Sequence, residues 1–161
     1  MAGDLKQKFG SSGQTLTCTL ASLANGSARA STAVDNSSNL YSDVLLLLKI
    51  KAGGSGVTST GYVNVYAYGT ADGGTTYSEG VSGSDAGVTL TSPPNVRLIG
   101  VIAMVATSTT YYSPLMSVAS AFGGVMPDHW GIIIENKSGG AFDSTEGNHA
   151  KLYQGVMGQY T

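Results

Sequence analysis

The sequence predicts an all-β protein, a single-domain antiparallel β-sandwich of the jelly-roll type with about eight strands. Apolar and polar residues alternate with a period of two over most of the chain, and helical periodicity is nearly absent. Turn-forming residues interrupt the alternation at a spacing of about 8–12 residues, which is common in sandwiches and jelly rolls. The composition agrees, because 23 of the 161 residues are glycine and only 11% are charged, against roughly 25% in an average soluble domain.

The first half of the chain contains the strongest alternation. A strand is expected at Thr15–Leu23, where Leu16, Cys18 and Leu20 share one face. The apolar run Val44–Leu48 is short and bounded by turn signals, which predicts a central strand buried on both faces. The predicted strands of this half are Thr15–Leu23, Ala28–Val34, Tyr41–Lys51 and Tyr62–Tyr68.

The second half begins with a Gly/Ser/Asp-rich stretch, Thr70–Gly87, which is expected to be an exposed loop. Two prolines, Pro93 and Pro94, stop a short strand because proline cannot donate to a ladder. Thr107–Pro114 is predicted to be a loop, and Met116–Phe122 fits either a strand or one helical turn. The remaining predicted strands are Val88–Leu90, Asn95–Ala106, Trp130–Asn136 and His149–Gln159.

Two segments follow from this pattern, an N-terminal arm at residues 1–14 and a sandwich domain at 15–161. The arm is polar and is expected to be flexible; it either orders against a neighbouring subunit or frays as a terminus. Free sheet edges are usually protected by charges, lysine above all. Because charges are scarce here, we expect other subunits to cover the edges.

Charge and targeting signals exclude several classes of protein. The net charge is −2, and eight dispersed basic residues form no patch that would bind nucleic acid. The N-terminus lacks the apolar region of a signal peptide, and Val44–Leu48 is far shorter than the ~20 residues of a membrane span. We therefore expect synthesis in a cytosol, with no nucleic-acid or membrane partner. The only cysteine, Cys18, is predicted to be a buried structural thiol.

No motif indicates catalysis, a cofactor or a metal. Gly56–Gly61 has the glycine spacing of a phosphate loop but lacks the lysine that would follow. His129 and His149 are not accompanied by residues spaced as zinc ligands, and there is no nucleophile elbow. The acidic turns at Asp72 and Asp143 do not match a calcium loop. We predict a protein that is not an enzyme and has no cofactor or metal.

The tyrosines are the candidate binding residues. Tyr62, Tyr66 and Tyr68 lie on one face of their predicted strand, where they would form core, a subunit interface or a platform for sugar rings. Tyr111 and Tyr112 lie in a predicted loop. All five are candidate interface residues: Tyr62, Tyr66, Tyr68, Tyr111 and Tyr112.

A resemblance to a known group of proteins comes from two segments. Residues 122–142 include Trp130-Gly131-Ile132-Ile133-Ile134-Glu135-Asn136-Lys137-Ser138-Gly139, and the closing strand contains Tyr153-Gln154-Gly155. These segments, together with the Leu-rich strand Tyr41–Lys51, resemble a small protein encoded among the virion structural genes of tailed bacteriophages. The resemblance extends from about Thr15 to the end of the chain. It implies a virion protein and no active-site residues.

Three functions are consistent with these observations. The favoured one is a capsid decoration or cement protein that binds the major capsid protein as a homo-oligomer, with a trimer favoured, and stabilises the shell. The second is a tail, collar or fibre accessory protein of the virion; the absence of internal repeats weighs against a fibre tip. The third is a carbohydrate-binding sandwich, which would need solvent-exposed Tyr66 and Tyr68.

Overall fold

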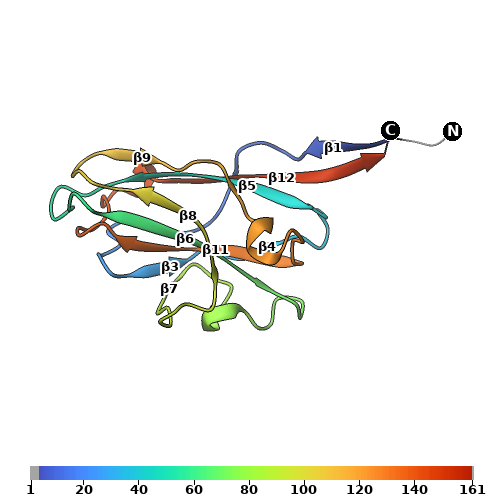
Figure 1. Ribbon diagram of the computed structural model, residues 1–161, viewed down its shortest axis with the longest axis horizontal. Helices are drawn as coiled ribbons and strands as arrows, with labels where there is room; N and C mark the ends of the chain where they lie inside the picture. The colour runs from blue at the N-terminus through green and yellow to red at the C-terminus, as the bar shows by residue number, and fades with distance from the viewer. Residues whose placement is uncertain (1–3, 161) are drawn as a thin grey trace.

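The computed structural model describes residues 4–160 and confirms the predicted antiparallel β-sandwich. Two sheets face each other across the core (Figure 1). Sheet A has the order β1-β12-β5-β10, with β2 also paired to β12 and β9 to β5, and sheet B has the order β7-β3-β11-β6-β8, with β4 paired to β11. The strands of sheet A are β1 (Leu5–Phe9), β2 (Gln14–Thr15), β5 (Asp43–Lys51), β9 (Thr110–Tyr112), β10 (Met116–Ser117) and β12 (Ala150–Tyr160). Those of sheet B are β3 (Ala28–Ala30), β4 (Val34–Asp35), β6 (Tyr62–Thr70), β7 (Ala86–Val88), β8 (Arg97–Ala103) and β11 (His129–Lys137).

The connections give the sandwich jelly-roll topology. The last strand, β12, lies between β1 and β5, and β11 lies between β3 and β6. Strands from the two ends of the chain are therefore interleaved with strands from its middle in both sheets, as two Greek keys require. The helical content of the described residues is limited to three short 3-10 helices, η1 (Ser78–Gly80), η2 (Ala119–Phe122) and η3 (Glu146–Asn148).

The main core lies between the sheets, where alternate residues of each strand point inward. Trp130 is its largest side chain, and its ring packs edge-on against Tyr153 at a centroid distance of 5.4 Å. Cys18 is buried in the same cluster, as predicted, and burial raises the pKa of its thiol to about 12. The inward residues of the three central strands are Val44, Leu46, Leu48 and Ile50 from β5, Val63, Val65 and Ala67 from β6, and Trp130, Ile132 and Ile134 from β11.

The first predicted strand, Thr15–Leu23, is wrong as a strand although its buried face is right. Only Gln14–Thr15 joins a ladder, and the chain then crosses from sheet A to sheet B with Leu16, Cys18 and Leu20 still buried. Side-chain carboxylates replace the missing strand partners. Asp85 accepts hydrogen bonds from the Thr19 amide and hydroxyl, and Glu146 accepts from the Leu20 and Ala21 amides at 2.8 Å each.

Strand β5 is buried on one face only, which corrects the prediction of two buried faces. Val44, Leu46 and Leu48 are inaccessible, whereas Leu45 and Leu47 are half-buried on the opposite face. The predicted loop Thr107–Pro114 contains the short strand β9, which pairs with the end of β5. Met116–Phe122 resolves into strand β10 followed by helix η2.

Residues 130–139, which resemble the phage proteins, have a structural role at their C-terminal end. Asn136 is buried, and its side-chain amide donates to the carbonyls of Leu23 and Gly140 while its oxygen accepts from Ser138. Gly139 has φ of +95°, and a Cβ on Gly140 would overlap the Ser55 carbonyl. These residues therefore join three loops at one end of the sandwich.

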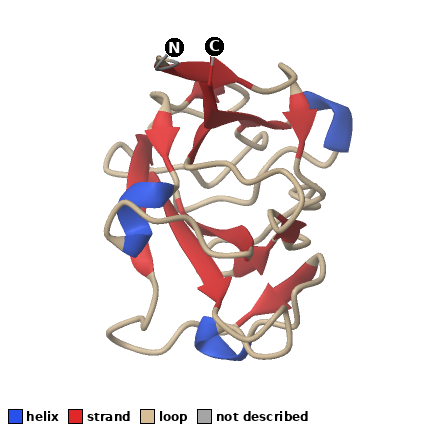
Figure 2. Ribbon diagram, turned by 90° about the vertical axis from the view of Figure 1, so that its right-hand side faces the viewer, coloured by secondary structure: helices blue, strands red, loops and turns tan. Residues whose placement is uncertain are grey.

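The N-terminal arm is more ordered than predicted in its described part. Residues 5–9 form β1, which pairs along its whole length with Val156–Tyr160 of β12. We call this pair, residues 5–9 and 156–160, the terminal ribbon. It projects beyond the sandwich, and the first and last described residues lie at its tip (Figures 1 and 2).

Candidate interaction surface

The outer face of sheet B is covered by the chain itself. Residues 71–96, which we call the covering segment, include the edge strand β7 and otherwise lie below sheet B in Figure 1. Tyr77 and Val81 of this segment are buried against Tyr68 and Ile133 in a second apolar cluster. The rings of Tyr68 and Tyr77 meet edge-on at 5.4 Å, and the Tyr68 hydroxyl donates to the Ser31 carbonyl at 2.6 Å. Most residues of the Gly-rich stretch Thr70–Gly87 are exposed, in line with the predicted exposed loop, but Tyr77 and Val81 are buried against sheet B.

The five candidate tyrosines are dispersed by the fold. Tyr66 and Tyr68 are buried under the covering segment, so neither offers a ring to a sugar or to a partner. Tyr62 is exposed at the margin of the same face, and the hydroxyl of Tyr111 accepts from the Val105 and Ala106 amides. Of the five tyrosines, Tyr112 is the one that is exposed on sheet A, where it lies opposite Lys49 in the pairing of β9 with β5.

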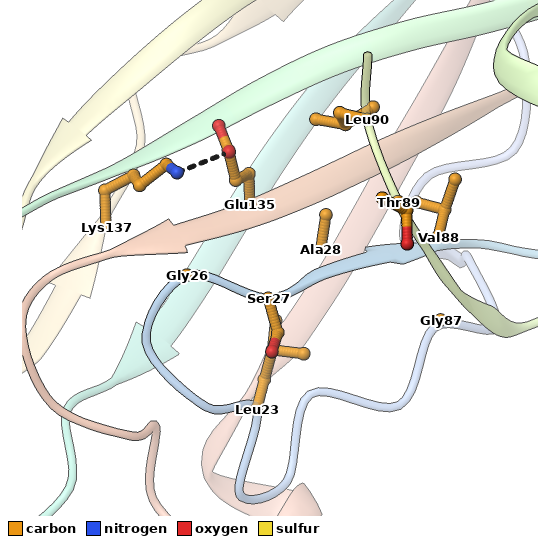
Figure 3. A pocket seen from close by; sticks show the side chains of 10 residues that line it. All are labelled: Leu23, Gly26, Ser27, Ala28, Gly87, Val88, Thr89, Leu90, Glu135 and Lys137. Carbon is orange, nitrogen blue, oxygen red and sulfur yellow. Dashed lines mark ion pairs between the residues drawn. The ribbon is translucent and has the colours of Figure 1, made fainter. Parts of the chain in front are cut away.

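A polar cavity of about 530 Å³ lies beside the covering segment, between strands β3, β7 and β11 (Figure 3). Glu135 and Lys137 form an ion pair of 2.9 Å at its wall, and Glu135 also accepts from Asn64 and Tyr66. Burial raises the pKa of Glu135, but these hydrogen bonds outweigh burial and the net pKa is lowered. The carboxylate is therefore charged and satisfied by its own neighbours.

His149 and the acidic turn at Asp72 have structural partners. His149 accepts from the Lys51 amide at 3.3 Å, and its other ring nitrogen lies 3.1 Å from the Asp143 carbonyl. Asp72 accepts from Thr70, Thr75 and Thr76 and so closes its own turn. Within residues 4–160, no three His, Cys, Asp or Glu side chains are grouped as metal ligands, and no helix has the length and apolar character to cross a membrane.

The outer face of sheet A differs from that of sheet B because no segment of the described chain covers it (Figure 1). Residues directly opposite each other in an antiparallel pair share a face, so Leu47 of β5 and Leu152 of β12 lie together on this side. With Leu45 and Leu115 they line a shallow hollow of about 200 Å³, which we call the groove. Leu115 and Tyr112, at 65% and 66% exposure, extend the apolar surface.

Sequence reasoning missed most of this surface, although a signal was present. A strand with one solvated face alternates, whereas Val44–Leu48 has no polar residue. Such a run indicates that both faces avoid water, but it does not distinguish burial inside the chain from burial by another one. Leu45 and Leu47 are therefore the residues that a search for unexplained apolar positions would have identified.

Further exposed apolar side chains lie on the terminal ribbon. Leu5 and Tyr160 face each other at its tip, and Phe9 lies opposite Val156 at its base. Leu5, Phe9 and Tyr160 are 67%, 52% and 78% exposed, and exposed large apolar side chains that gather on one side of an element mark interaction sites. Comparisons with known protein families, curated proteins and solved structures found no match to this chain.

Proposed function

We propose that this protein is a structural component of a bacteriophage virion, and specifically a capsid decoration or cement protein that binds the shell as a homo-oligomer, with a trimer favoured. In this proposal the chain is made in the host cytoplasm, joins the particle and acts by binding, without catalysis. Its partners are other copies of itself and the major capsid protein.

The observation that carries the proposal is the uncovered apolar face of sheet A. Burying such a surface is favourable by roughly 25 cal/mol per Å², so a chain that leaves it exposed gains stability on assembly. The jelly roll also supports a capsid role, since this fold is common in viral capsids, although lectins use it too. The resemblance of the Trp130–Gly139 segment points the same way, and that segment is used here to hold loops.

The copy number of the chain in purified virions tests the proposal. We expect quantitative mass spectrometry to find the protein at an abundance comparable to that of the major shell protein, and we expect particles stripped of it to break at lower temperature. A small, ring-like number of copies would move the assignment to the tail, collar or fibre. Absence from the particle would overturn both assignments.

A surface variant tests the role of sheet A separately. Leu115→Asp places a charge beside the groove and should abolish self-association and shell binding, while the free energy of unfolding changes little because Leu115 is mostly exposed. Val125→Asp is the matched control, since Val125 is exposed in the loop between η2 and β11. Sedimentation velocity gives the oligomeric state, and equal behaviour of the two variants would exclude the sheet A face as the interface.

A further inference from the structure

The terminal ribbon has no core of its own. Strand β12 pairs with β5 only from Ala150 to Val156, and from Met157 onward its partner is β1. Tyr41 packs on Gly10 and Gly155 and closes the end of the sandwich at this point. An isolated two-stranded ribbon is at best marginally stable in water, so this one gains stability from a surface that covers it.

The polarity of the ribbon is the reverse of that in the sandwich. In the sandwich, sheet A points its most apolar residues inward. Along the ribbon, Leu5, Phe9 and Tyr160 continue the outer face, whereas Lys6 and Lys8 lie on the side that continues the inner face. The side that carries Leu5, Phe9 and Tyr160 is therefore exposed in the described chain and open to a second molecule.

We propose that the terminal ribbon of one copy lies in the groove on sheet A of a second copy, with Leu5 and Tyr160 inserted beside Leu47 and Leu115. One chain supplies both the projecting apolar element and the apolar hollow. The ribbon continues sheet A outward (Figure 1), so it cannot reach its own groove while β12 stays paired with β5. A second copy is therefore the occupant that matches both surfaces.

The distribution of charge along the chain also favours a second copy as the occupant of the groove. The terminal ribbon contains Lys6 and Lys8 and no acidic residue, whereas the rest of the chain contains six basic and ten acidic residues. The basic ribbon is thus attracted to the net acidic remainder of another copy. Because ribbon and groove are different surfaces, the contact is head-to-tail, and head-to-tail contacts close into rings when the rotation permits. This inference rests on the self-association in the proposed function and gives it a geometry.

Disulfide trapping between two differently tagged chains tests the contact. One chain carries Leu5→Cys and the other Leu115→Cys; the native Cys18 is buried and does not compete. We expect oxidation of the mixture to give a mixed disulfide dimer as the main product. Leu5→Cys mixed with Val101→Cys is the control, because Val101 is comparably accessible on β8 but lies on the outer face of sheet B. Equal trapping in both mixtures, or in neither, overturns the inference.

A second test measures the Kd of self-association and does not depend on introduced cysteines. The double variant Leu5→Ser/Tyr160→Ser should weaken self-association at least about tenfold in Kd, because the loss of two large apolar contacts exceeds the ~1.4 kcal/mol that a tenfold change represents. Gln159→Ser, an uncharged substitution on the opposite side of the ribbon, should leave Kd unchanged. A monomeric wild type, or equal effects of the two variants, contradicts the contact. Virion copy number remains an independent test, so failure of the ribbon contact leaves the virion assignment standing.

Discussion

The two outer faces of this sandwich are both apolar, but only the face of sheet B is covered by another segment of the described chain. On sheet B, the covering segment supplies Tyr77 and Val81 and buries Tyr68 beneath them. On sheet A, Leu45, Leu47 and Leu152 remain half-buried, with Leu115 exposed beside them. The apolar residues of this charge-poor chain therefore have two roles. On sheet B they form a second core, and on sheet A they form a surface that is available to partners.

The covered face should contribute most to stability, and Tyr68→Ala tests this directly. The substitution leaves a cavity between β6 and the covering segment and removes a hydrogen bond to Ser31. We expect the free energy of unfolding, measured by urea denaturation, to fall by about 4 kcal/mol. Tyr68→Phe keeps the ring and should cost about 1 kcal/mol. A small effect of Tyr68→Ala would mean that the covering segment is held by its hydrogen bonds alone.

Neighbouring leucines on β5 give the sharpest contrast between the inside and outside of sheet A. Leu48 is inaccessible and Leu47 is half-buried in the groove. Leu48→Ala should lower the free energy of unfolding by about 3 kcal/mol, whereas Leu47→Ala should lower that of the monomer by about 1 kcal/mol or less.

Self-association should reverse this order. We expect Leu47→Ala to weaken the oligomer in sedimentation experiments and Leu48→Ala to leave it intact below its unfolding transition. Equal stability losses would show that the groove is already closed within the monomer.

The fold class was predictable because period-two alternation depends only on neighbouring residues. The alternation correctly placed Leu16, Cys18 and Leu20 in the core, but it could not show that Asp85 and Glu146, far away in sequence, take the place of strand partners. Local pattern thus reports which side of the chain is buried and says little about what supplies the backbone hydrogen bonds.

The candidate surface was harder to predict, because burial by a distant segment leaves no local sign. Tyr66 and Tyr68 have the alternation of a half-exposed strand, yet a Gly-rich segment more than eight residues further along the chain covers them. Conversely, Leu5 and Phe9 lie in an arm whose composition is polar, and their exposure follows from pairing with β12 at the opposite end of the chain. Both outcomes depend on contacts between remote residues.

A smaller effect should separate the two faces by pH. Asp85 belongs to the covering segment and accepts from Arg29 and Thr19. Burial raises the pKa of Asp85, but these hydrogen bonds outweigh it and the net pKa lies below its ordinary value of 3.8. Since the folded form binds the proton less readily, this stabilisation is complete above pH 3.8 and is lost as the pH falls through the folded pKa. The described residues that line the groove on sheet A include no carboxylate.

Asp85→Asn should therefore cost about 2 kcal/mol at neutral pH, and the difference from wild type should shrink below pH 3.8 as Asp85 itself becomes protonated. Urea denaturation at a series of pH values measures both quantities. Self-association of Asp85→Asn at neutral pH should equal that of wild type, because the substitution lies across the sandwich from the groove. A difference in unfolding free energy that stays constant with pH would show that the Asp85 carboxylate acts through its shape, and a loss of association would show that the two faces are coupled.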